Sequence, residues 1–411
     1  MISSTNNNIS FTSNPLINAT SFIEERVLLN KALLDGARDA SIVCHTNNKN
    51  EREERIRRFC IAWSAAFLTP FVTLPLTNRL AMKHIAKLSS GYFSNENNLI
   101  KLSNKYLKDA NLTKIGIEEL SKKENLGEFL QKNQDYEKVR KKILNAKNAV
   151  LSFDFLFTST TLGCAGFVNR YKTRKKTGRD GFSAEFNMAD KDLVEKRAEA
   201  FKKSEKLRDS LFIISVLSLA SLPLILKKGM NSQGKLSNFI KKYADKFDYN
   251  DGIFMKRLPF LMMTIVADLG LILSSRNQTE VKDNAVRLSA TQAAFFGGDI
   301  IIGSTLAGLS DKLFKTELLD KNCKKTLVNK LIPPVKSIKE LQGKNKATAT
   351  GLFWVNMASL FAILGIGIPK MMNKIIKKDI QQDVSRNNLN NILKYPKVFE
   401  SFKTTNTQIV C

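Results

Sequence analysis

Residues 148–169 read NAVLSFDFLFTSTTLGCAGFVN, and this run, whose only charged residue is Asp154, decides the fold. A helix needs about 20 mainly apolar residues to cross the hydrocarbon core of a bilayer. An ionised carboxylate in hydrocarbon costs free energy, so it is tolerated where it faces a protein interior, a partner or water. The run therefore predicts a transmembrane helix that carries a buried acidic side chain.

Comparable apolar segments recur along the chain. They are Phe59–Asn78, Ser210–Leu226, Leu258–Ser275, Leu288–Ser310 and Ala347–Pro369. The only charged residues inside them are Asp268 and Asp299, so no basic residue within the six segments can pair with the aspartates. These lengths predict an all-α, multi-pass transmembrane bundle of about six spans, joined by long basic helical loops. The shortest segment and those with an aspartate are the weakest, which leaves open two to four spans.

A large soluble helical protein with apolar core helices is the other reading of these segments. Ala347–Pro369 argues against it, because this run lacks the polar stripe that a surface helix shows.

The six segments divide the chain into four regions. Residues 1–58 form a polar, disordered tail followed by an amphipathic helix from Phe22 to Val43, and residues 1–20 lack the pattern of a signal peptide. Residues 59–226 and 227–369 form two membrane halves of three spans each. Residues 370–411 form a basic C-terminal tail. The expected location is a membrane, with the bacterial inner membrane as the first assignment.

A weak similarity between the two halves suggests a duplication. Aligning Asp154 with Asp299 places DFLFTSTTLG against DIIIGSTLAG, which agree at four positions, mostly small residues. A three-span unit used twice would be inverted in the membrane, as in many secondary transporters. Shared composition of membrane helices is the alternative explanation.

The net charge of +27 raises the question of an acidic partner. The densest basic cluster directly follows the second predicted span and comprises Arg170, Lys172, Arg174, Lys175, Lys176 and Arg179. Basic loops beside spans suit anionic lipid headgroups, and we expect the bilayer to be the partner. A protein or nucleic-acid partner is the alternative. Nucleic acid is not expected, because only Tyr171 and Phe182 lie nearby to stack on bases.

The residues that usually carry catalysis or hold metals are sparse here. The chain has two histidines, about 40 residues apart, and five scattered cysteines without a CxxC pair. No phosphate-binding loop, dinucleotide fingerprint, nucleophile elbow or zinc-protease motif is present. The sequence therefore predicts no enzyme, no metal site and no cofactor.

The fifth predicted span also carries small residues along one face, namely Ala293, Gly297, Ser304 and Gly308. Small faces let membrane helices approach closely, so this stripe predicts a helix-packing contact that buries Asp299 in the bundle.

Two functions are compatible with these features. The first is a small-solute or ion transporter in which Asp154, Asp268 and Asp299, staggered in depth, form a proton or cation path. The structural reading of the same residues is that they cap broken helices, as Gly297 and Gly298 suggest for Asp299, or bond a neighbouring Ser or Thr. The second function is a membrane-embedded structural or interaction protein whose basic arms, Arg79–Lys147 and Met188–Arg208, bind lipids or partner proteins.

Overall fold

The computed structural model describes residues 14–394 except 47, 89–98, 100, 101, 103, 105, 106, 108–135, 251–253, 321–328 and 330. Most of the predicted N-terminal tail, much of the C-terminal tail and the centre of the predicted arm Arg79–Lys147 thus lie outside the described residues. Within them the regular secondary structure is helical apart from one β-hairpin, β1 (Tyr249–Asn250) with β2 (Phe254–Met255), and one isolated bridge. The all-α prediction is confirmed.

The first half of the chain forms long helices joined by short ones. They are α1 (Pro15–Glu24), α2 (Val27–Cys44), α3 (Lys49–Leu68), η1 (Thr69–Thr73), α4 (Leu74–Leu88), α7 (Tyr136–Gly163), α8 (Ala165–Thr177), η3 (Ser183–Glu185), α9 (Lys191–Lys202), α10 (Glu205–Asn231), α11 (Lys235–Tyr243) and η4 (Ala244–Lys246).

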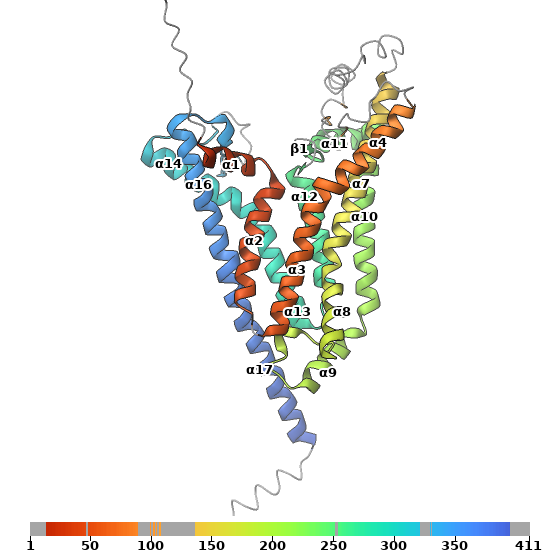
Figure 1. The fold of residues 1–411 in the computed structure, drawn as a ribbon, viewed down its shortest axis with the longest axis vertical. Coiled ribbons are helices and arrows are strands. Elements are labelled where there is room, and N and C mark those ends of the chain that lie inside the picture. The colour runs from red at the N-terminus through yellow and green to blue at the C-terminus, as the bar shows by residue number, and fades with distance from the viewer. Residues whose placement is uncertain are drawn as a thin grey trace, which may run out of the picture.

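The second half of the chain, after the β-hairpin, also consists of long helices joined by short ones. Its helices are α12 (Arg257–Leu273), α13 (Gln278–Ala293), η5 (Ala294–Gly298), α14 (Asp299–Phe314), η6 (Ile338–Glu340), α16 (Gly343–Phe361), η7 (Ala362–Gly367) and α17 (Ile368–Lys394). The long helices lie side by side, with α9 at one end of the bundle and α11 and α14 towards the other (Figure 1). We call these the α9 end and the α11 end.

Three of the long helices pass through a π-helical turn. These turns are η1, η5 and η7. In η1 the turn contains Pro70, whose ring and missing N–H disfavour a regular α-helical bond at that point. At η5 the chain stays helical through Gly297 and Gly298, so these glycines do not break the helix before Asp299.

Five continuous helical stretches are long and apolar enough to cross a membrane. They are Lys49–Ile85, Arg140–Thr177, Glu205–Asn231, Gln278–Phe314 and Gly343–Arg386, and each contains one predicted span. The remaining predicted span, Leu258–Ser275, corresponds to α12, which is helical over only 17 residues. Spanning length is thus found for five of the six predicted segments.

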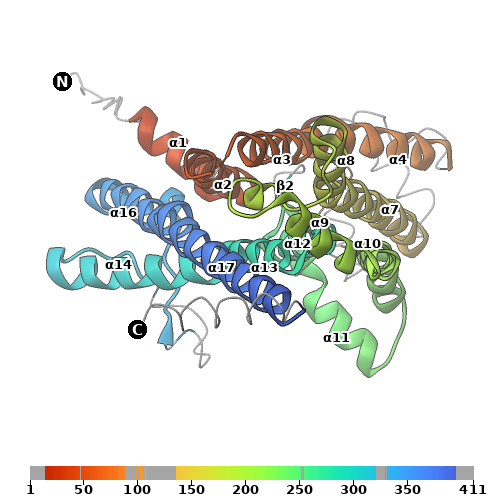
Figure 2. The ribbon, with the colours of Figure 1, turned by 90° about the horizontal axis from the view of Figure 1, so that it is seen from below.

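Helix α2 is an additional member of the bundle. It contacts α3, α16, η7 and α12, and it runs alongside α3 and the α16–α17 helix in two perpendicular views (Figures 1 and 2). The sequence identified this region as an amphipathic helix but not as part of the bundle. Its side chains therefore reach positions that the apolar segments alone did not predict.

Helices α7 and α12 cross closely at two glycines, Gly163 and Gly270. A Cβ atom built on Gly270 would lie 2.8 Å from the Cα atom of Gly163 and 2.5 Å from the ring of Phe212 on α10. Because such distances are below any normal carbon contact, only glycine fits at this crossing. It fixes how α7 and α12 face one another, and with them Asp154 and Asp268.

The residues of the predicted small-residue stripe on the fifth span do not all pack against one neighbouring helix. Ala293 is exposed, and a Cβ atom on Gly297 would meet nothing within 4 Å. Ser304 donates a hydrogen bond to the Pro333 carbonyl at 2.8 Å, and Gly308 faces Leu319. The second half of the stripe thus packs on the connector before α16.

Candidate functional site

A cavity of about 130 Å³ lies in the middle of the bundle, between α2, α3, α7, α12 and α13. We call it the central cavity. Its wall is largely apolar and includes Trp63, Phe254 and Phe260, yet it also contains the carboxylates of Asp154 and Asp268. Two of the three aspartates predicted for an ion path therefore share one cavity.

Asp154 is held by hydroxyl groups. The Tyr249 hydroxyl donates to one carboxylate oxygen and the Thr158 hydroxyl to the other, both at 3.1 Å, and Asp154 is only 3% exposed. Thr158 and Thr69 share a further hydroxyl–hydroxyl contact at 2.9 Å, which links the site to η1. Burial and the neighbouring carboxylate raise the pKa of Tyr249 well above its ordinary value, so its hydroxyl keeps the proton that it donates.

Asp268 has an amide as its hydrogen-bonding partner. The Gln292 side chain of α13 donates to its carboxylate, and Thr264 donates to the Gln292 carbonyl oxygen at 3.2 Å. No base lies within 4 Å of Asp154 or Asp268 in the described part of the chain. Both carboxylates are thus bonded, but neither is paired with a cation.

Helix α2 brings four further charges to the cavity wall, and these neutralise one another. Lys31 pairs with Asp35 at 2.6 Å, while Arg38 pairs with Asp35 at 3.2 Å and with Asp39 at 2.6 Å. Arg38 also donates to Thr291 of α13 at 2.7 Å. These residues are not predicted from the sequence, where they lie on an amphipathic helix outside the apolar segments.

Arg58, directly before the first predicted span, is the remaining charge on the cavity wall. Its guanidinium donates to the Asn284 amide oxygen at 2.9 Å. Among the residues that the structure describes, no carboxylate lies within 4 Å of Arg58. The cavity wall therefore holds three charges without an ion-pair partner, namely Arg58, Asp154 and Asp268.

Asp299 lies apart from the central cavity. Its carboxylate accepts from Arg257 at 3.1 Å and from the Asn356 amide at 2.8 Å. Arg257 immediately precedes the predicted segment Leu258–Ser275, so the base that pairs with Asp299 comes from just outside the six segments. Asp299 ties α14 to α12 and α16 and has no access to the cavity wall.

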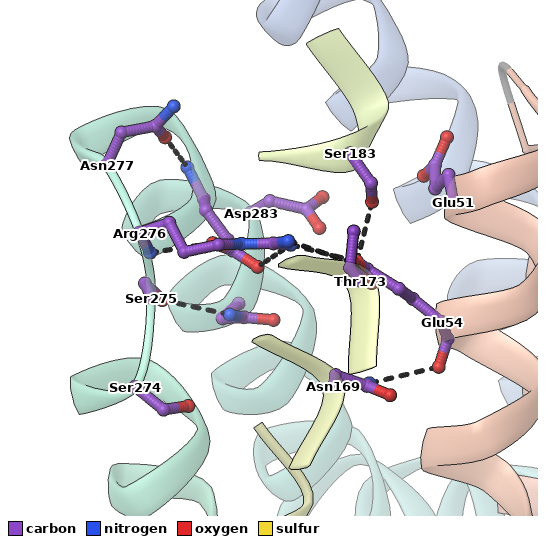
Figure 3. A network of polar contacts seen from close by, with 12 residues as sticks. Glu51, Glu54, Asn169, Thr173, Ser183, Ser274, Ser275, Arg276, Asn277 and Asp283 are labelled. Atoms are coloured by element: carbon purple, nitrogen blue, oxygen red, sulfur yellow. Dashed lines mark hydrogen bonds and ion pairs between the residues drawn. The ribbon is translucent and has the colours of Figure 1, made fainter. Parts of the chain in front are cut away.

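A network of buried ion pairs, drawn in part in Figure 3, lies towards the α9 end of the central cavity. Arg276 donates to both carboxylate oxygens of Glu54 at 2.8 Å and pairs with Glu280 at 2.9 Å. Glu54 also accepts from Thr173 at 2.5 Å and Ser183 at 2.6 Å. Because these groups come from α3, α8, η3 and the α12–α13 link, the network ties four parts of the chain together.

A second pair of contacts extends the network. Asp283 of α13 accepts from Arg55 of α3 at 2.6 Å and from Arg287 at 2.5 Å. A smaller cavity of about 30 Å³, lined by Glu54 and Arg55, shares Arg58 and Leu271 with the central cavity. We call Glu54, Arg55, Arg276, Glu280, Asp283 and Arg287 the α9-end cluster, since it separates the central cavity from that end.

The α9-end cluster is built from two similar hairpins, α2–α3 and α12–α13. Residues 48–58 read NKNEREERIRR and residues 277–287 read NQTEVKDNAVR, each with an acid at the fourth and seventh positions and arginine at the eleventh. Asn48 and Asn277 both cap their helices by accepting from the backbone three residues later, at 2.9 Å. The two hairpins differ from the pair of segments that the Asp154–Asp299 alignment compared.

Glu185 lies beside this cluster in η3 and is fully buried. It pairs with Arg197 of α9 at 3.1 Å and accepts from Asn277 at 3.1 Å. Burial outweighs these contacts and raises the pKa of Glu185 to about 7.

The predicted basic cluster after the second span is partly neutralised within the protein. Arg170 pairs with Glu205 at 2.5 Å, Arg174 with Asp180 at 3.3 Å, and Lys176 with Glu53 at 2.6 Å. Arg179 lies over the ring of Phe186. In the described part of the chain, Lys172 and Lys175 are exposed without an ion-pair partner.

Within the described ranges, no three His, Cys, Asp or Glu side chains lie close enough to hold a metal ion. Comparison of the chain with protein-family models, curated proteins and solved structures gives no match.

Proposed function

We propose that this chain is a multi-pass integral membrane protein that transports a small solute or ion, with the central cavity as its binding site. The observation that carries the proposal is the cavity itself. It lies inside a bundle of helices of spanning length, and its carboxylates Asp154 and Asp268 have no base within 4 Å among the described residues. Unpaired carboxylates inside a membrane protein are costly and mark sites that bind ions or substrates.

The distribution of apolar side chains supports membrane insertion. On α10, Ile213, Ile214 and Leu217 are each more than half exposed, and the α3–α4 helix exposes Phe71 and Leu76 in the same way. Exposed apolar surface on this scale is unfavourable in water and favourable against lipid tails. These helices thus present apolar side chains on their outer surface, while the charges of the α9-end cluster such as Glu54, Arg276 and Asp283 are buried, as expected for a bundle in a bilayer.

Transport also requires a closed side that can open, and the α9-end cluster supplies a candidate. It joins the hairpins α2–α3 and α12–α13 through Arg276–Glu54 and Arg55–Asp283. In many transporters, structural repeats move against each other around a central site. We place the closed gate at this cluster, which must separate to connect the cavity with the α9 end.

The test is uptake into proteoliposomes that contain the purified protein, measured with panels of radiolabelled small cations, zwitterions and anions. Asp154→Asn and Asp268→Asn are expected to abolish uptake of the transported solute, because each removes a charge from the cavity wall. Asp299→Asn is the matched control, since it changes the same residue type outside the cavity. Full uptake by the Asp154→Asn/Asp268→Asn double variant would overturn the proposal.

A membrane-embedded interaction protein is the second candidate, favoured by the exposed Lys172 and Lys175 on α8. The arm Met188–Arg208 contributes less to it than its charge suggests. Val194 and Ala198 are buried, and Arg197 pairs with both Glu185 and Asp383. This arm forms part of the folded bundle, so its deletion would disturb the fold as well as any contact with a partner.

A further inference from the structure

We infer that the central cavity accepts a small organic monocation, such as an alkylammonium ion. This inference rests on the proposed function for its biological meaning. The charge, the aromatic wall and the size of the cavity each favour such an ion.

The charge on the cavity wall favours a cation. Three basic and four acidic side chains line the cavity, so with all seven ionised one negative charge is in excess. Lys31 and Arg38 are paired with the acids of α2, so the excess lies with Asp154 and Asp268 against the single Arg58. An uncompensated charge in a low-dielectric interior is costly, and one bound positive charge removes that cost. The preferred occupant therefore carries a net charge of +1.

The uncharged part of the cavity wall is apolar and partly aromatic. Trp63, Phe254 and Phe260 line the same cavity as the two carboxylates, and so do Met255 and Met263. Aromatic faces attract ammonium groups, and carboxylates add the opposite charge. An inorganic ion with its water shell makes poor use of such an apolar wall, whereas an alkylammonium ion uses both kinds of contact.

The volume of the central cavity suits a small ligand. A cavity of about 130 Å³ is close to the roughly 150 Å³ engineered cavity that holds benzene. A ligand with a few heavy atoms beyond the charged nitrogen fits this volume.

Three probes that share a tert-butyl group and differ in charge test this inference: tert-butylammonium, tert-butanol and pivalate. Binding to the full-length protein in detergent is measured by calorimetry and by the shift in unfolding temperature. We expect saturable binding of tert-butylammonium only. Asp154→Asn and Asp268→Asn should each weaken it by at least about tenfold, as expected for the loss of one partner of a desolvated charge pair. Asp299→Asn should bind like the parent protein.

Arg58→Met distinguishes a cation site from a site for zwitterions. If the occupant is a monocation, removing the positive guanidinium strengthens tert-butylammonium binding. If Arg58 instead anchors a carboxylate, the wild-type protein binds alanine or pivalate and Arg58→Met loses that binding, which would overturn the inference. Equal binding of tert-butanol and tert-butylammonium, or stronger binding of sodium or potassium, would overturn it as well.

Ligand binding and uptake into proteoliposomes, measured on the same protein, test the cation site and the transport function separately. Cation binding that depends on Asp154 and Asp268, without uptake into proteoliposomes, supports the site and contradicts transport. Uptake of an anion that depends on the cavity supports transport and contradicts the monocation.

Discussion

The central cavity and the α9-end cluster lie next to each other and use the same residue types in opposite ways. In the cluster, Glu54, Glu280 and Asp283 each have an arginine within 3 Å. On the cavity wall, Asp154, Asp268 and Arg58 have no opposite charge within 4 Å in the part of the chain that the structure describes.

The difference separates charges that hold the fold from charges that are free to bind. A buried ion pair costs much to break once formed, because removing one partner leaves the other charge unpaired. A carboxylate that already lacks a cation loses no such partner when it is neutralised. The two regions should therefore respond differently to the same kind of substitution.

Arg276→Met is expected to have the largest effect on stability. It leaves Glu54 and Glu280 without their shared guanidinium, and breaking a buried pair costs about 3–5 kcal/mol. The measurement is the free energy of unfolding in detergent. Arg174→Met is the control, because the Arg174 side chain is 61% exposed and its pair with Asp180 should contribute less than about 1 kcal/mol. Similar losses in both variants would contradict the assignment of the cluster as a structural tie.

Glu185 makes the stability of the α9 end depend on pH. Its folded-state pKa of about 7 lies above the ordinary value of 4.5, so between these pH values the folded state binds more protons than the unfolded state. Its contribution is therefore present below pH 4.5 and is lost as pH rises through about 7. We expect stability to fall by on the order of 2–3 kcal/mol across this window.

The control for this prediction is Glu185→Gln, which removes the titrating group and keeps an acceptor for Asn277. The difference between the parent and this variant should change between pH 4.5 and pH 7 and become constant above pH 8. A constant difference over the whole range would show that folding does not raise the pKa of Glu185.

Asp154→Asn should have a much smaller effect on stability than Arg276→Met. The amide keeps the shape of the side chain and an oxygen that can accept from Tyr249, and no ion pair is lost. We expect a change below about 1 kcal/mol, or a small gain, because a buried charge without a cation is removed. Unfolding in the absence of ligand measures this effect. A loss as large as that of Arg276→Met would mean that Asp154 has a cationic partner in the folded protein.

The apolar segments were sufficient to predict the long helices, and each predicted segment is helical. They did not reveal α2 as a bundle member, because its four charges look like those of a surface helix. Lys31, Asp35, Arg38 and Asp39 pair along the helix itself, and a hydropathy pattern records each charge without its partner. This is why the sequence predicted Asp154 and Asp268 as site residues but none of the four charges that α2 adds to the cavity wall.

Which aspartates reach the cavity depends on how each helix is rotated about its axis, and the sequence does not specify this rotation. Asp154 and Asp268 face the same cavity because α7 and α12 cross at Gly163 and Gly270. Asp299 is turned towards Arg257 and Asn356 instead. The spacing of Asn48 and Asn277 from their acids was visible in the sequence and could have identified the paired hairpins. The alignment of Asp154 with Asp299 compared the second and fifth predicted spans, which are a different pair of segments.

The smallest expected effect concerns the surface of α8, where the comparison between paired and unpaired charges applies again. Lys172 and Lys175 are exposed without a carboxylate partner in the described residues, whereas Lys176 pairs with Glu53. We expect Lys172→Ala/Lys175→Ala to reduce the stabilisation of the protein by phosphatidylglycerol in mixed micelles, by about 1 kcal/mol per lysine at most. Stability without lipid should change by less than about 0.5 kcal/mol. Lys176→Ala, the matched control, should leave the lipid effect almost unchanged, because Glu53 already neutralises that lysine. Equal losses in both variants would mean that net charge alone attracts the headgroups and that pairing within the protein has no influence on the contact.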